Sequence, residues 1–111
     1  MSAIPVADTA FWTAACRADE SLREHPIIVD PLAARLCGEQ GLALGRDLER
    51  RGRVHEVVVL RTRIVDERIA AALVLDGIRH VAVLGAGLDA RPYRLHLPGG
   101  VRWSEVDLPG V

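Results

Sequence analysis

The longest regular pattern of apolar and polar residues predicts a helix from Val54 to Asp76. At 100° per residue, one side of this helix is largely apolar. The residues on that side are Val54, Val57, Val58, Val65, Ile69 and Ala72. The run 57–60 would also suit a strand, but the helical period continues around it for about six turns. We therefore expect a helix, which Gly77 ends.

Beyond Gly77 the apolar period shortens and predicts two parallel strands. Residues 79–84 form a short apolar run that ends in glycines, which is typical of a buried parallel strand. A helix of about two turns is expected over 88–96, with Asp89 as its cap. A second strand over 101–106 then ends at Asp107. The order strand, turn, helix, strand predicts the first β-α-β unit of an open α/β sheet.

Before the long helix, the pattern breaks into three shorter helical pieces. We expect these pieces at residues 8–24, 30–36 and 42–51. Pro26 ends the first piece, and Asp30 caps the second. Gly38 closes the second piece in a left-handed conformation, and Gly45 interrupts the third. The amino-terminal region is therefore predicted to be helical.

Composition and charge exclude several classes of protein. The 111 residues include 14 basic residues, all of them arginine, and 15 acidic residues, for a net charge of −1. This balance argues against the positive field of a nucleic-acid-binding protein. No leader pattern opens the chain, and no apolar run reaches the ~18 residues that a membrane span needs. We expect a cytoplasmic protein with no nucleic-acid or membrane partner.

The cysteines and histidines do not form a metal-ligand pattern. Cys16 and Cys37 are far apart in the sequence, with no histidine at ligand spacing, so we expect two reduced, partly buried thiols. The four histidines share no spacing and are expected at the surface or at strand ends. They are His25, His55, His80 and His96. The sequence therefore predicts no metal site.

The turn after the first predicted strand has the residues of a nucleotide-binding turn. Residues 85–90 fit the pattern G-x-G-x-x-A, with a strand before it and a helix start after it. Gly85 and Gly87, on either side of Ala86, would let a ligand lie against the backbone, because glycine has no Cβ. Asp107 ends the next strand, where a carboxylate can accept both hydrogens of a ribose diol. This combination favours a nucleoside ligand over a plain strand-to-helix turn.

Arg61 is the second unusual feature. On the helical wheel it lies within about 20° of Val54 and Ala72, at the centre of the apolar face, whereas Arg63 points to solvent. A guanidinium on a core-facing stripe needs an anionic partner. A protein carboxylate, a snorkelling conformation and a ligand carboxylate all satisfy this requirement, and the pattern leaves them open.

Several segments together resemble the leucine carboxyl methyltransferase-like family, and more closely its bacterial S-adenosylmethionine-dependent branch, which is abundant in actinobacteria. The resemblance covers essentially the whole chain, and the glycine-Asp-Arg segment is its most specific part. The segments are Arg61-Thr62-Arg63-Ile64-Val65-Asp66, residues 83–95 and Glu105-Val106-Asp107-Leu108-Pro109, supported by residues 12–18 and 30–33.

The resemblance implies a function and a role for each site residue. A helical region (1–53) would precede the start of a class I, Rossmann-like domain (54–111) that binds S-adenosyl-L-methionine. Gly85 and Gly87 would line the methionine and ribose parts, Asp107 would hold the ribose hydroxyls, and Arg61 would pair with the methionine carboxylate. Residues 89 and 91 would shape the loop. The implied reaction is methylation of a small-molecule hydroxyl or carboxylate, with no catalytic residue assigned.

Two further expectations concern completeness. Class I methyltransferases have a larger sheet than the two strands expected here, so the chain resembles the truncated amino-terminal part of a longer enzyme. We expect it to be inactive alone and to associate with itself through open strand edges. A Rossmann oxidoreductase fragment that binds NAD and a non-catalytic remnant are the alternative functions. The first of these uses the same glycines and Asp107.

Overall fold

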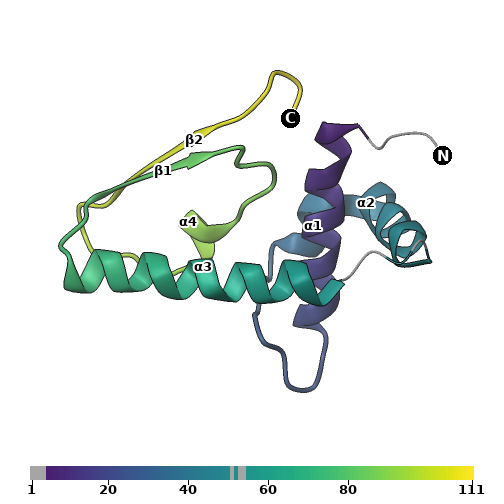
Figure 1. Cartoon of the computed structure of the whole chain (residues 1–111), viewed down its shortest axis with the longest axis horizontal. Helices are drawn as coiled ribbons and strands as arrows, with labels where there is room; N and C mark the ends of the chain where they lie inside the picture. Colours follow the sequence, from purple (N-terminus) through teal and green to yellow (C-terminus); the bar gives the residue numbers. More distant parts are fainter. Residues whose placement is uncertain (1–4, 51, 53–54) are drawn as a thin grey trace.

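The computed structural model describes residues 5–50, 52 and 55–111. Three helices precede a parallel pair of strands, so the chain is a mixed α/β protein, as predicted. Figure 1 shows α1 and α2 near the amino-terminal end of the long helix α3. The elements are α1 (Val6–Ser21), α2 (Ala33–Arg50), α3 (His55–Leu75), β1 (His80–Leu84), α4 (Arg91–Arg94) and β2 (Arg102–Val106).

The helices α1 and α2 pack closely through small residues. Gly38 has φ of 60° and ψ of −173°, so it kinks α2 at the position where a left-handed residue was predicted. Gly45 does not interrupt the helix, and that expectation is wrong. A Cβ at Gly45 would lie 3.0 Å from the Cβ of Ala15, so this glycine lets the two helices approach. The second and third predicted pieces are one kinked helix.

The segment between α1 and α2 is held to α1 by Asp30. The helix α1 ends at Ser21, earlier than the predicted residue 24 and well before Pro26. Asp30 Oδ1 accepts hydrogen bonds from the backbone N–H groups of Leu32 and Ala33, both at 3.0 Å, which confirms its predicted capping role. Its second oxygen forms an ion pair with Arg17 at 2.9 Å. Asp30 therefore holds this segment both to the start of α2 and to α1.

The helix α3 forms as predicted, but it ends at Leu75 and buries a different face. Gly77, the predicted stop, follows two residues later with φ of 66°. Val57 and Val65 are exposed, and so is Arg61, which is not in the core. The expected face is therefore wrong at these positions, while Val54 lies outside the described residues. Neither α3 nor any other described helix is long and apolar enough to cross a membrane. The buried residues are His55, Val58, Val59, Thr62, Asp66 and Leu73.

Both predicted strands are present and pair in parallel, with His80 opposite Arg102 and Leu84 opposite Val106. The expectation of a buried strand is wrong, because no residue of β1 is buried and its exposure alternates along the strand. No described element covers both faces of the pair. The predicted two-turn helix over 88–96 is also wrong, since α4 is a single turn with Ala90 as its N-cap.

Candidate functional site

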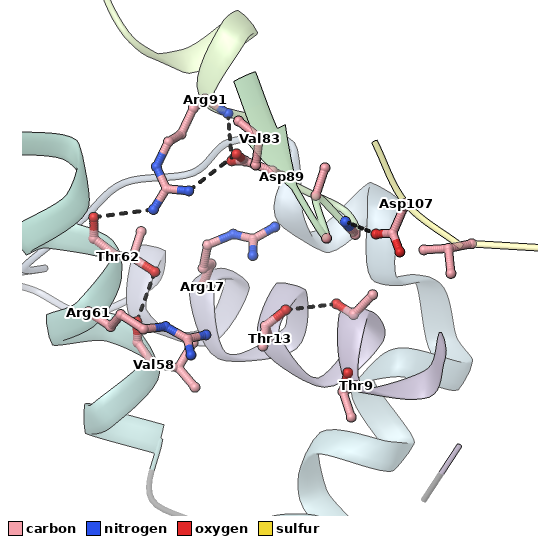
Figure 2. Close-up of a pocket in the computed structure, with 15 residues that line it drawn as sticks. Thr9, Thr13, Arg17, Val58, Arg61, Thr62, Val83, Asp89, Arg91 and Asp107 are labelled. Carbon is pink, nitrogen blue, oxygen red and sulfur yellow. Dashed lines mark hydrogen bonds and ion pairs between the residues drawn. The ribbon is translucent and has the colours of Figure 1, made fainter. Parts of the chain in front are cut away.

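A cavity of about 290 Å³ lies between α1, the amino-terminal half of α3 and the turn that follows β1. Figure 2 shows side chains from these elements converging on it. All five residues that the sequence singled out line this one cavity, although they come from three separate segments of the chain. They are Arg61, Gly85, Ala86, Gly87 and Asp107.

The glycine turn owes its shape to positive φ angles. Gly85 and Gly87 have φ of 65° and 55°, values that residues with a Cβ rarely adopt. A Cβ at Gly85 would meet no atom within 4 Å, so open space lies against this backbone. A Cβ at Gly87 would lie 3.1 Å from the Cβ of Ala10, so the turn also packs closely on α1. The two glycines therefore serve different steric needs.

Asp107 lies beside this turn, at the end of β2. Its Oδ2 accepts a hydrogen bond from the backbone N–H of Gly87 at 2.5 Å, and its Oδ1 accepts one from the N–H of Leu108 at 2.7 Å. The side chain is exposed on the cavity side of the strand pair. Two N–H donors thus orient the carboxylate, and its remaining lone pairs are available to a ligand.

Arg61 reaches the cavity from α3. Figure 2 shows its side chain extending toward the α1 residues of the wall. Within the described ranges Arg61 forms no hydrogen bond or ion pair, and it is exposed to solvent. Arg61 therefore does not need an anionic partner on account of burial, because water solvates an exposed guanidinium. Arg63 is exposed, as predicted, and pairs with Glu67 at 2.7 Å.

A buried charge network fixes the loop after the glycine turn. Arg91 Nε donates to Asp66 Oδ1 at 2.7 Å, and its Nη1 lies 3.2 Å from Asp89 Oδ2. Arg94 also donates to both oxygens of Asp66, at 2.8 and 2.9 Å. Asp89 and Arg91 thus tie the loop to α3, in agreement with the loop-shaping role that the resemblance implies. Asp66 was not recognised from the sequence as the centre of this network.

The wall formed by α1 was also missed. Thr9, Thr13 and Arg17 line the cavity from this helix. Arg17 is buried, with its Nε on Asp30 and its Nη2 donating to the carbonyl oxygen of Leu88, just after the glycine turn. This arginine therefore links α1 to the turn. The resemblance of residues 12–18 was the only signal in the sequence that pointed to this helix.

Comparisons with known proteins match the chain over nearly its whole length. Residues 10–111 match the family "Leucine carboxyl methyltransferase". Proteins of Mycobacterium tuberculosis, Mycobacterium marinum and Mycobacterium avium, each named "Putative S-adenosyl-L-methionine-dependent methyltransferase", are 40%, 39% and 41% identical to it. These alignments cover 96% of this chain, which spans 38–39% of the length of each relative. The chain belongs to the leucine carboxyl methyltransferase family.

Proposed function

We propose that this chain forms the cofactor-binding part of an S-adenosylmethionine-dependent methyltransferase that methylates a hydroxyl or carboxylate oxygen of a small molecule. One observation carries the proposal: Arg61, the 85–87 turn and Asp107 line a single cavity. Family membership and the names of the relatives support it. On this proposal β1 and β2 begin a class I, Rossmann-like sheet over 54–111, and residues 1–53 form a helical wall beside it.

The chemistry of the cavity fits the three parts of this cofactor. The open space beside Gly85 accepts a ligand against the backbone. The oriented carboxylate of Asp107 accepts hydrogen bonds from a ribose diol. The guanidinium of Arg61, which pairs with no described group, is suited to a carboxylate by its planar fork of donors. The cavity volume of about 290 Å³ is at the lower end of the ~300–1,000 Å³ typical of ligand sites.

In the mechanism that we propose, these residues orient and do not transfer protons. When bound, S-adenosylmethionine supplies an electrophilic methyl group on a positively charged sulfur. Arg61 and Asp107 would hold the ligand on the two sides of its sulfur, so the methyl group would have a fixed direction. The cofactor would supply this methyl group to an acceptor oxygen and keep the electron pair of the carbon–sulfur bond, and a hydroxyl acceptor would release its proton to solvent. Orientation and exclusion of water supply much of the rate in such displacements.

Two alternative functions differ in what this cavity would bind. A Rossmann oxidoreductase would place NAD on the glycine turn and Asp107, but membership of a methyltransferase family favours the sulfonium cofactor. A non-catalytic remnant would bind neither ligand. Affinity for the two cofactors therefore distinguishes all three functions.

The first test is calorimetric titration of the chain with S-adenosylmethionine, S-adenosylhomocysteine and NAD. We expect both S-adenosyl compounds to bind more tightly than NAD. Asp107→Asn should weaken their binding by about 1–3 kcal/mol, because a charged acceptor is lost. Preference for NAD would refute the proposal, and binding of neither ligand would favour the remnant.

The second test separates two neighbouring arginines of α3. Arg61→Ala should weaken S-adenosylmethionine binding by about 1.5–3 kcal/mol, the value of a charged hydrogen bond. It should leave the free energy of unfolding unchanged within about 0.5 kcal/mol, because Arg61 is exposed. Arg63→Ala is the matched control, since its side chain pairs with Glu67 away from the cavity. Equal affinities of the two variants for S-adenosylmethionine would show that Arg61 does not bind it.

A further inference from the structure

Three helices bring together a set of side chains that the cofactor cavity does not use. Asp19 lies on α1, Glu49 near the end of α2, and His55 is the first residue of α3. One ligand atom from each residue lies within 4.8 Å of the others. Figure 1 shows the amino-terminal end of α3 beside α1, where this junction forms. The cluster is distinct from the cavity that contains Arg61.

The histidine of this cluster has unsatisfied hydrogen-bonding groups. His55 is 8% exposed, and both ring nitrogens are buried without a hydrogen-bond partner among the described residues. Its Nδ1 lies 3.9 Å from Glu49 Oε1, which is beyond hydrogen-bond distance. Buried polar atoms are rarely left unpaired, because burial removes the water that would otherwise solvate them. The ring therefore lies beside two carboxylates with its nitrogen atoms unpaired among the described residues.

We propose that Asp19, Glu49 and His55 form a binding site for a divalent transition-metal cation such as Zn²⁺. One imidazole and two carboxylates are ordinary zinc ligands, and water completes a tetrahedral shell. Ligand atoms at about 2.1 Å from zinc lie roughly 3.4 Å apart. The atoms here are farther apart, at up to 4.8 Å, but the two carboxylates are on exposed side chains that can rotate inward.

A nearby thiol offers an internal check on the ligand set. Burial raises the pKa of the Cys16 thiol to about 12, and the negative charges of Glu49 and Asp19 contribute to this rise. The ligand atoms that lie together belong to Asp19, Glu49 and His55, and Cys16 is not among them. We therefore assign the cation to oxygen and nitrogen ligands. The ion would join α1, α2 and α3 at one point.

The experiment measures binding of Zn²⁺ alone to the chelator-treated 111-residue chain by calorimetry, with Co²⁺ as a spectroscopic substitute. We expect one saturable equivalent, at least about tenfold weaker binding in Glu49→Gln and in His55→Gln, and a Zn²⁺-dependent rise in melting temperature only in the intact protein. Glu24→Gln and His25→Gln are matched controls, because this acid and imidazole lie 3.8 Å apart at the exposed surface. Both controls should bind like the parent chain.

Several outcomes would overturn the proposal. These are the absence of saturable binding, equal loss in the control variants, or an intense thiolate charge-transfer band with Co²⁺, which would assign the ion to a cysteine. If His55→Gln does not fold, Asp19→Asn and Glu49→Gln decide the question, because both acids are exposed. Binding of S-adenosylmethionine is measured separately, so failure of one proposal leaves the other standing.

Discussion

The amino-terminal helix pair and the strand pair solve the problem of burial differently. Between α1 and α2, the small side chains of Ala14, Ala15 and Cys37 are almost fully buried and form a core. In the strand pair, Leu84 is 79% exposed and Val106 is 56% exposed. Two helices can bury one stripe each against the other, whereas two strands satisfy only their shared backbone hydrogen bonds and need further layers to cover their faces.

Polar contacts join the two regions, together with the packing of Leu88 against the core of the helix pair. Arg17 bonds both to Asp30 and to the backbone of Leu88, and Asp66 on α3 holds Arg91 and Arg94. The position of the glycine turn relative to α1 therefore depends on buried charges, which are costly when one partner is lost. The comparison predicts strong effects at the junction and in the helix pair, and weak effects in the strands.

The largest effect is expected at the junction. Asp66→Asn leaves Arg94 without its counter-charge and Arg91 with Asp89 alone, although the shape of the side chain is nearly unchanged. Removing one partner of a buried ion pair typically costs about 3–5 kcal/mol. Urea unfolding of this variant and of the parent chain measures the difference. A loss below about 1 kcal/mol would show that the network is solvated and does not hold the regions together.

A pair of leucine truncations compares the two regions directly. Leu48→Ala in α2 removes a side chain that is only 2% exposed and should cost about 2–5 kcal/mol through lost burial and a cavity. Leu84→Ala in β1 removes an exposed side chain and should change the free energy of unfolding by less than about 0.5 kcal/mol. Equal losses in chemical denaturation would mean that the strand pair is covered in solution.

The smallest effect separates the two glycines of the turn after β1. Gly85→Ala and Gly87→Ala both place an alanine in a left-handed backbone conformation, which lowers the free energy of unfolding by about 1–2 kcal/mol. Gly87→Ala should destabilise more, because its Cβ would crowd Ala10 of α1. Gly85→Ala should instead lower affinity for S-adenosylhomocysteine, since its Cβ occupies the open space beside the turn. Thermal melts and ligand titrations of both variants check this, and identical behaviour would contradict the different roles.

The local sequence was sufficient to predict features that depend only on neighbouring residues. The period of α3, the stop at Gly77, the kink at Gly38 and the two strands all follow from side-chain pattern and glycine positions. The length of α4 did not follow from the local sequence. Only one turn forms there, although the residues after Arg94 would also suit a helix. Short helices are marginal on their own, so their length is decided by what they contact.

Other predictions depended on contacts that a linear pattern does not contain. The phase of α3 was predicted from apolar residues, yet its buried stripe includes Thr62 and Asp66. These polar groups are tolerated inside because Thr62 bonds to the carbonyl oxygen of Val58 and Asp66 binds two arginines. A hydrophobic count cannot anticipate the arginine partners of Asp66, because they lie 25 and 28 residues further along the chain.

The sequence by itself determined the helices and strands, the nucleotide-binding pattern at the glycine turn and the family that the chain resembles. Those features are local, since they depend on backbone preferences and on short runs of residues. Only the tertiary structure decided that Arg61 is solvent-exposed at a cavity wall, that α1 supplies Arg17 to the same cavity, and that His55 is buried beside two acids. Packing brings residues together from distant positions, and the environment of each side chain depends on those neighbours.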